Sequence, residues 1–108
     1  MKKFHIAIST DKMEETIKDY SARLEMEPCV AILGEYALWR TESLNISVRY
    51  DPDGVPGTLR HLGWEDQNVS EFTLETDVNG IVWEGFSAKL QAEEINKLWP
   101  EANFQPGP

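Results

Sequence analysis

The feature that most constrains the fold is a short alternating strand followed directly by an amphipathic helix. Residues 4–9 alternate apolar and polar side chains with a period of two, which predicts a strand. From residue 12 to about 26 the apolar positions recur every three or four residues, which predicts one buried side of a helix. Asp11, with Glu14 three positions later, is a candidate cap for that helix, and Pro28 ends the helical pattern. The first 26 residues are therefore expected to contain both a strand and a helix.

Four further strands are expected between this helix and the middle of the chain. Their side chains alternate or form short apolar runs, and turn residues separate them, including the loop 51–57 with its Pro, Gly and Asp. The expected strands are residues 29–33, 36–41, 44–50 and 58–65.

The last third is expected to form a hairpin and a helix. Asn79-Gly80 is a strong two-residue turn signal between the alternating positions 72–76 and the apolar run 81–83. Ser87 can cap a final helix that Pro100 ends, and the tail beyond it is expected to be frayed or draped on the surface. The order of strand, helix, four strands, hairpin and helix predicts an α+β domain, with two helices packed on one mainly antiparallel or mixed sheet.

Composition limits the chain to one domain, residues 1–108, and disfavours two classes of partner. Ten basic against 19 acidic residues give a net charge of −9. Nucleic acids and anionic membrane surfaces select clustered Lys and Arg, so neither is an expected partner. Cys29 is the only cysteine, which excludes an intrachain disulfide, and no apolar segment has the length of a signal-peptide core or a membrane span. We therefore expect a cytoplasmic location.

A short internal sequence repeat, the histidine echo, links two expected strands that each contain a histidine. His5 and His61 lie 56 positions apart, and segments 4–8 and 60–64 both read histidine, aliphatic, small, apolar from their second position. Each segment begins an expected strand, and a helix and three strands separate the two. Because each histidine lies opposite the large apolar side chains of its strand, which face the expected core, both would line one cleft if the strands are adjacent.

At these residues the chain resembles the vicinal oxygen chelate superfamily, which includes glyoxalases, extradiol dioxygenases and bleomycin-resistance proteins. The resemblance is carried by the strand 4–8, the helix end 20–25 and the second histidine strand 61–65, and it covers residues 4–66. It implies two βαβββ modules around a cupped sheet. Too few residues follow residue 65 for a full second module, so it implies an abbreviated module or a sheet completed by a second copy in a homodimer.

The same resemblance implies a metal site. In the family, the first strand of each module often supplies a ligand, and these positions match His5 and His61. Carboxylates from the last strand of each module commonly join them; Glu84 is the candidate from the second module, and the first module offers no match. The implied cofactor is one divalent ion (Zn, Ni, Mn or Fe), with Glu65 or Glu84 completing its shell or acting as a base.

A small-molecule ligand is the expected occupant of the cleft. Ser9, Ser47 and Arg49 are candidate ligand-binding residues, with Arg49 suited to a carboxylate or phosphate and Trp39 suited to stacking. Three functions remain open: a metal-dependent lyase, isomerase or dioxygenase; a metal-free cup that holds an organic molecule; and a protein-interaction domain that uses its acidic half. The paired histidines favour metal, whereas the missing carboxylate favours plain binding.

Overall fold

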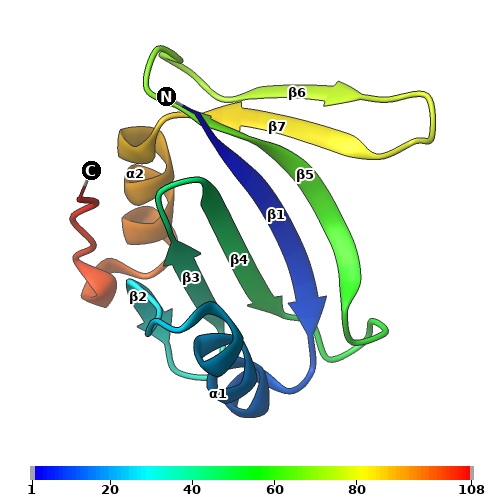
Figure 1. Cartoon of the computed structure of the whole chain (residues 1–108), viewed down its shortest axis with the longest axis vertical. Helices are drawn as coiled ribbons and strands as arrows, with labels where there is room; N and C mark the ends of the chain where they lie inside the picture. The colour runs from blue at the N-terminus through cyan, green and yellow to red at the C-terminus, as the bar shows by residue number, and fades with distance from the viewer. Residues whose placement is uncertain (1, 108) are drawn as a thin grey trace.

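Seven strands and two helices follow one another in the predicted order (Figure 1). The computed structural model describes residues 2–107. Its elements are β1 (Lys2–Thr10), α1 (Met13–Leu24), β2 (Val30–Ile32), β3 (Tyr36–Arg40), β4 (Leu44–Tyr50), β5 (Thr58–Asp66), β6 (Thr73–Thr76), β7 (Val82–Phe86), α2 (Ala88–Leu98) and a short 3-10 helix, η1 (Pro100–Ala102).

All seven strands form one mixed sheet in the order β2-β3-β4-β1-β5-β7-β6. β1 is parallel to β4 and β5 is parallel to β7, whereas the other neighbours are antiparallel. The predicted α+β class and mixed sheet are confirmed.

The two halves of the sheet repeat one arrangement. In the first half β4 lies between β1 and β3, and in the second half β7 lies between β5 and β6 with the same strand directions. The second half is shorter than the first because it has no counterpart of α1 or β2: β5 is followed along the chain directly by β6 and then β7. The halves meet where β1 and β5 run antiparallel, with His5 opposite Gly63 and Ala7 opposite His61.

The two helices cover opposite faces of the sheet. Side chains alternate along β3, so Ala37 and Trp39 pack under α1 while Tyr36 and Leu38 pack under α2. Each helix therefore closes its own small core. Both helices lie toward the β2–β4 half of the sheet, and β5, β6 and β7 extend beyond α1 (Figure 1).

One predicted helix cap is wrong and the other is confirmed. Asp11 does not cap α1; Lys12 occupies the cap position with no side-chain hydrogen bond to the helix, and its own amide donates to Thr10 Oγ1. The turn from β1 into α1 thus uses a threonine of the strand end. Ser87 caps α2 as predicted, its hydroxyl accepting from the Leu90 amide at 3.1 Å.

The face of β1 expected to be the main core is only half-buried. Phe4, Ile6 and Ile8 point to the α1 side, but α1 covers only the neighbourhood of Ile8. The opposite face is the more deeply buried one, with His5 only 2% exposed. The reason is that the second half of the sheet carries no helix on the α1 side, while α2 lies over the histidine face.

The C-terminal tail is docked onto α2. Phe104 is buried in the core beneath α2, and Asn96 bonds both its amide and its carbonyl, at 2.7 and 3.0 Å. None of the helices between residues 2 and 107 has the length and apolar character required to cross a membrane.

Candidate functional site

A small cup opens between the sheet and α2, on the histidine face. It contains a cavity of about 70 Å³ that is open to solvent at its mouth. That space holds roughly five waters, so the cup suits a ligand with few heavy atoms. Its walls come from five strands, β1, β3, β4, β5 and β7, from α2 with the residue that follows it, and from Phe72 in the loop before β6.

Two imidazoles and one carboxylate converge in the cup. His5 Nε2 and His61 Nε2 are 2.9 Å apart, and His61 Nε2 lies 3.8 Å from Glu84 Oε1. One donor atom from each of the three residues lies within 4.8 Å of the other two. The structure thus brings together all three residues predicted as metal ligands.

Strand register explains this convergence. His61 is opposite Ala7 and His5 is opposite Gly63, so the two imidazoles emerge diagonally from neighbouring strands on one face. Gly63 is in turn paired with Glu84 of β7. A side chain at Gly63 would collide with the Glu84 backbone, so the glycine permits the approach that brings the carboxylate to the histidines.

A buried asparagine fixes the hydrogen of His5. His5 Nδ1 lies 3.1 Å from the Asn45 main-chain oxygen and 2.9 Å from its Oδ1. Since a carbonyl oxygen only accepts, Nδ1 carries the hydrogen and Nε2 keeps its lone pair. The 2.9 Å contact between the imidazoles is then a hydrogen bond from His61 Nε2–H to His5 Nε2.

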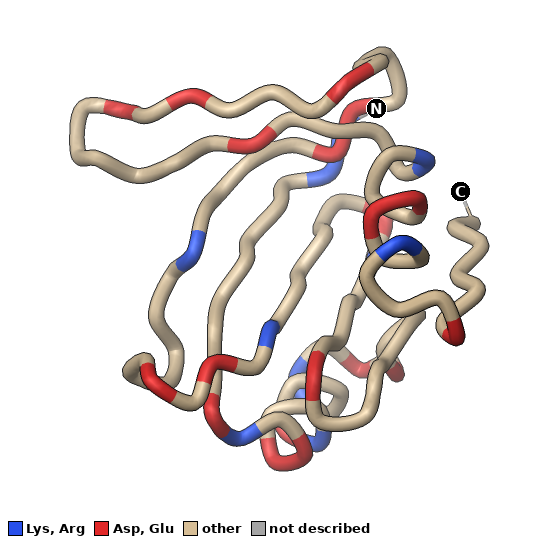
Figure 2. The backbone as a smooth tube through the Cα atoms, turned by 180° about the vertical axis from the view of Figure 1, so that it is seen from behind, with Lys and Arg blue, Asp and Glu red and all other residues tan. Residues whose placement is uncertain are grey.

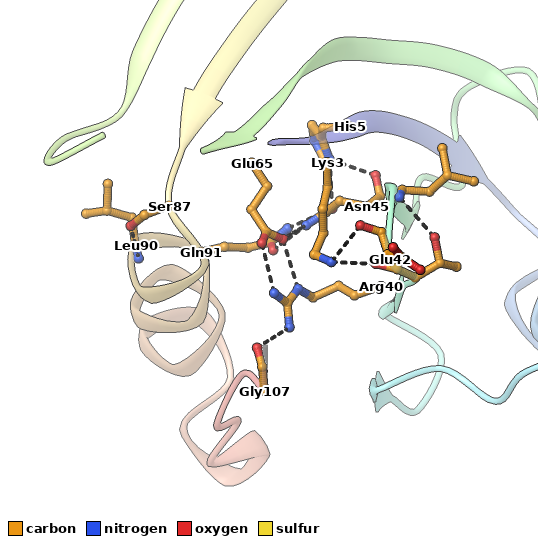
Figure 3. A network of polar contacts seen from close by, with 12 residues as sticks. Lys3, His5, Arg40, Glu42, Asn45, Glu65, Ser87, Leu90, Gln91 and Gly107 are labelled. Atoms are coloured by element: carbon orange, nitrogen blue, oxygen red, sulfur yellow. Dashed lines mark hydrogen bonds and ion pairs between the residues drawn. The ribbon is translucent and has the colours of Figure 1, made fainter. Parts of the chain in front are cut away.

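Asn45 is itself held by Glu65 and Gln91, and Arg40 in turn holds Glu65 (Figure 3). Its amide group donates to Glu65 Oε1 and Gln91 Oε1, both at 2.8 Å, and Gln91 returns a bond to Asn45 Oδ1 at 3.2 Å. Glu65 also accepts two hydrogen bonds from the guanidinium of Arg40, from Nε to Oε1 and from Nη2 to Oε2, each 2.8 Å long. The orientation of His5 therefore depends on a chain of buried charge-assisted bonds.

This network places Glu65, the expected catalytic residue, outside the cup lining. Burial alone would raise the pKa of its carboxyl, but hydrogen bonds from Arg40 and Asn45 outweigh burial and hold that pKa below its usual range. Both carboxylate oxygens accept hydrogen bonds, and Glu65 is not among the residues that line the cup. Glu65 instead supports Asn45 and, through it, His5.

The three converging groups have shifted pKa values. Burial lowers the pKa of His5, and burial together with the neighbouring His5 lowers the pKa of His61 to about 4. Burial, and then the charge of Glu94, raises the pKa of Glu84 to about 7. Near neutral pH both imidazoles are therefore uncharged, with lone pairs to offer, and Glu84 is poised to lose a proton.

The predicted ligand-binding residues divide into three outcomes. Ser47 and Arg49 line the cup. Ser9 lines an adjoining hollow that shares Arg49 with the cup. Trp39 lies on the opposite face, fully buried under α1 with its indole donating to Ser21 Oγ at 3.3 Å, so it cannot stack on a ligand here. Side chains of β3 alternate between the two faces of the sheet, and Trp39 is at a position that faces α1 and not the cup.

Several cup residues were not anticipated from the sequence. Gln91, Glu94 and Leu98 lie three and four positions apart on one side of α2, a spacing that could have marked them once the helix was placed. Arg60 had no such signal. The β1–β5 register shifts between Ala7 and Ile8, and this bulge leaves Arg60 unpaired beside His61, so that both line the cup.

The donor set fits a divalent transition metal. Two imidazole nitrogens and one carboxylate oxygen make the three-protein-ligand set of sites that keep a position open. A tetrahedral ion needs ligand atoms about 3.4 Å apart, so the imidazoles would separate by about 0.5 Å from their present contact. For His61 Nε2 to bind the ion, the ring hydrogen would move from Nε2 to Nδ1, and the imidazole would stay neutral.

No family model matches the chain, and no curated protein is significantly similar to it.

Proposed function

We propose that this protein binds one divalent metal ion and a small organic ligand in the cup between the sheet and α2. The convergence of His5 Nε2, His61 Nε2 and a Glu84 oxygen within 4.8 Å carries the proposal. His5 is the ligand whose free nitrogen is assigned by its surroundings, because Asn45 accepts from Nδ1. Metal-binding histidines in general are oriented in this way.

The repeated sheet halves support a place for the protein among divergent, small relatives of the vicinal oxygen chelate superfamily. Both histidines come from the first strand of a half, and Glu84 comes from the strand parallel to it in the second half. The three ligands leave a coordination position open. A bound ion would there polarise a ligand oxygen, the chemistry on which a metal-dependent lyase, isomerase or dioxygenase relies.

Metal titration tests this proposal. Metal-stripped protein is titrated with Zn²⁺, Ni²⁺, Mn²⁺ and Fe²⁺, alongside His5→Ala, His61→Ala and Glu84→Gln, with Glu75→Gln on exposed β6 as the matched control. We expect one ion per chain, with the histidine variants at least 100-fold weaker and Glu75→Gln unchanged. Affinity weaker than micromolar for every ion, or equal affinity in all variants, would contradict the proposal.

We further propose that two copies associate through the uncovered sheet face opposite the cup. Phe4, Trp64 and Trp83 form an aromatic cluster there, with ring centroids 5.3 and 6.1 Å from Phe4, and Trp64 is 41% exposed. The cluster lies at the β1–β5 junction, about which the two halves of the sheet are related. A twofold contact between copies would bring this cluster onto itself.

A further inference from the structure

Two of the four arginines lack an acidic partner among residues 2–107, although acidic residues outnumber basic ones by 19 to 10. Arg23 pairs with Asp19 at 2.9 Å and Arg40 pairs with Glu65 at 2.8 Å. Between residues 2 and 107, no carboxylate oxygen lies within 4 Å of a guanidinium nitrogen of Arg49 or Arg60. In the described part of this acidic chain, the two guanidinium groups therefore have no carboxylate at salt-bridge distance.

Both unpaired arginines line the same cup as the histidines. Arg49 comes from β4 and Arg60 from the β5 bulge, with β1 between their strands. The guanidinium of Arg49 lies 5.5 Å from the centre of the Trp99 ring, which holds it by a cation–π contact. Figure 2 shows basic positions within the middle strands as well as in the helices, whereas most acidic positions lie in loops, the β6–β7 hairpin and the helices.

The two guanidinium groups share two hollows. Arg49 and Arg60 both line the cup, and both line the adjoining hollow that contains Ser9. Two positive charges in one place favour an anion between them, and guanidinium groups bind carboxylate and phosphate oxygens through paired hydrogen bonds.

The acidic groups of the cup do not cancel this preference once a metal is bound. Glu84 and Glu94 also line the cup, and when both are ionised they balance the charges of Arg49 and Arg60. A divalent ion on the histidines would then leave the cup with a charge of +2. Such a site favours an anion over a neutral molecule of the same shape.

We propose that Arg49 and Arg60 form an oxyanion subsite, and that the ligand of the cup is a small organic acid. Its charged group binds the two guanidiniums, while a second oxygen faces His5, His61 and Glu84. The small free volume of the cup limits such a ligand to a few heavy atoms. The role of the second oxygen rests on the proposed metal site, whereas the anion subsite can be measured without metal.

Isothermal titration calorimetry with three probes tests the subsite. Glycolate, its neutral amide glycolamide, and inorganic phosphate are titrated into metal-stripped protein, and glycolate and glycolamide also into zinc-loaded protein. The variants are Arg49→Gln, Arg60→Gln and Arg60→Lys, with Arg23→Gln on the exposed side of α1 as the matched control. Thermal unfolding checks that each variant is folded, and zinc affinity is measured in parallel.

We expect glycolate to bind at least about tenfold more tightly than glycolamide, and each Arg→Gln change to remove about tenfold of that affinity. The glycolate affinity of Arg60→Lys should lie between those of the wild type and Arg60→Gln, and the affinity of Arg23→Gln should match the wild type. Zinc affinity should stay equal or rise in Arg60→Gln, because a repelling charge is lost. Phosphate binding as tight as glycolate binding would assign the subsite to oxyanions in general, whereas weaker phosphate binding would assign it to carboxylates.

Equal binding of glycolate and glycolamide by the wild type overturns the inference, even if a variant fails to fold. Glycolate binding unchanged by both Arg→Gln variants overturns it as well. If zinc does not bind but the arginine variants lose glycolate, the metal proposal fails and the anion subsite stands. The two proposals therefore fail on different measurements.

Discussion

Asn45 determines which nitrogen of His5 is free. It is fully buried, and it is the residue through which Arg40, Glu65 and Gln91 act on the histidine. We expect Asn45→Leu to weaken zinc binding by about 10- to 100-fold, because the His5 ring loses its orienting side chain. Competition with a chelating dye measures the affinity. Gln91 contacts Asn45 but not His5, so Gln91→Leu should weaken zinc binding much less. Equal losses of zinc affinity in both variants would contradict this role of Asn45.

Glu84 makes the stability of the metal-free protein depend on pH. Its pKa is raised from its ordinary value of 4.5 to about 7 by burial and Glu94, so the folded state prefers the protonated form, and stability is lost as the pH rises from 4.5 through about 7. Glu84→Gln should therefore be more stable than wild type by about 2–3 kcal/mol at pH 8, and this advantage should shrink as the pH falls towards 4.5. Urea unfolding with a chelator present, at pH 8 and pH 5, measures it. An advantage that does not change with pH, or one shared by Glu75→Gln, would refute this explanation.

At the scale of elements, the repeated halves of the sheet identify where a ligand is missing. Ser47 pairs with Ala7 on parallel β4 as Glu84 pairs with Gly63 on parallel β7. Ser47 is thus the counterpart of Glu84, and it also lines the cup. We expect Ser47→Glu to tighten zinc binding by about tenfold by supplying a fourth ligand. Ser43→Glu, in the loop before β4, is the control, and weaker binding in Ser47→Glu than in this control would argue against the repeat.

Element order was predictable and element pairing was only partly so. Alternation, helical spacing, the Asn79-Gly80 turn and Ser87 are local signals, and each predicted its element. The phase of β3, which turned Trp39 away from the cup, depends on which face α2 covers, a contact distant in sequence. The bulge at Arg60 likewise arises from pairing with β1 and leaves no mark in the sequence.

The candidate site followed the same division. His5, His61 and Glu84 were identified from the histidine echo and a family resemblance, and the structure brings them together. The role of Glu65 could not be predicted, because its partners Arg40 and Asn45 come from other strands.

At the scale of the whole molecule, the shortened second half leaves an aromatic sheet face without a helix. If two copies cover it, light scattering should give a mass of about twice 12.3 kDa. Trp64→Lys should return the protein to a monomer, since the charge would be buried in the contact. Val78→Lys, at the fully exposed tip of the hairpin, is the control. A wild-type monomer at high concentration would count against the pairing.

The metal site is tested most directly by the nitrogen spectrum of the two histidines, the only ones in the chain. Long-range ¹H–¹⁵N correlation on metal-free protein near neutral pH should show hydrogen on Nδ1 of His5 and on Nε2 of His61, with His61→Asn giving the assignment. One equivalent of zinc should shift both Nε2 resonances together and move the His61 hydrogen to Nδ1, while His5 keeps its own. A spectrum that excess zinc leaves unchanged, or in which only one imidazole responds, would contradict the proposed metal site.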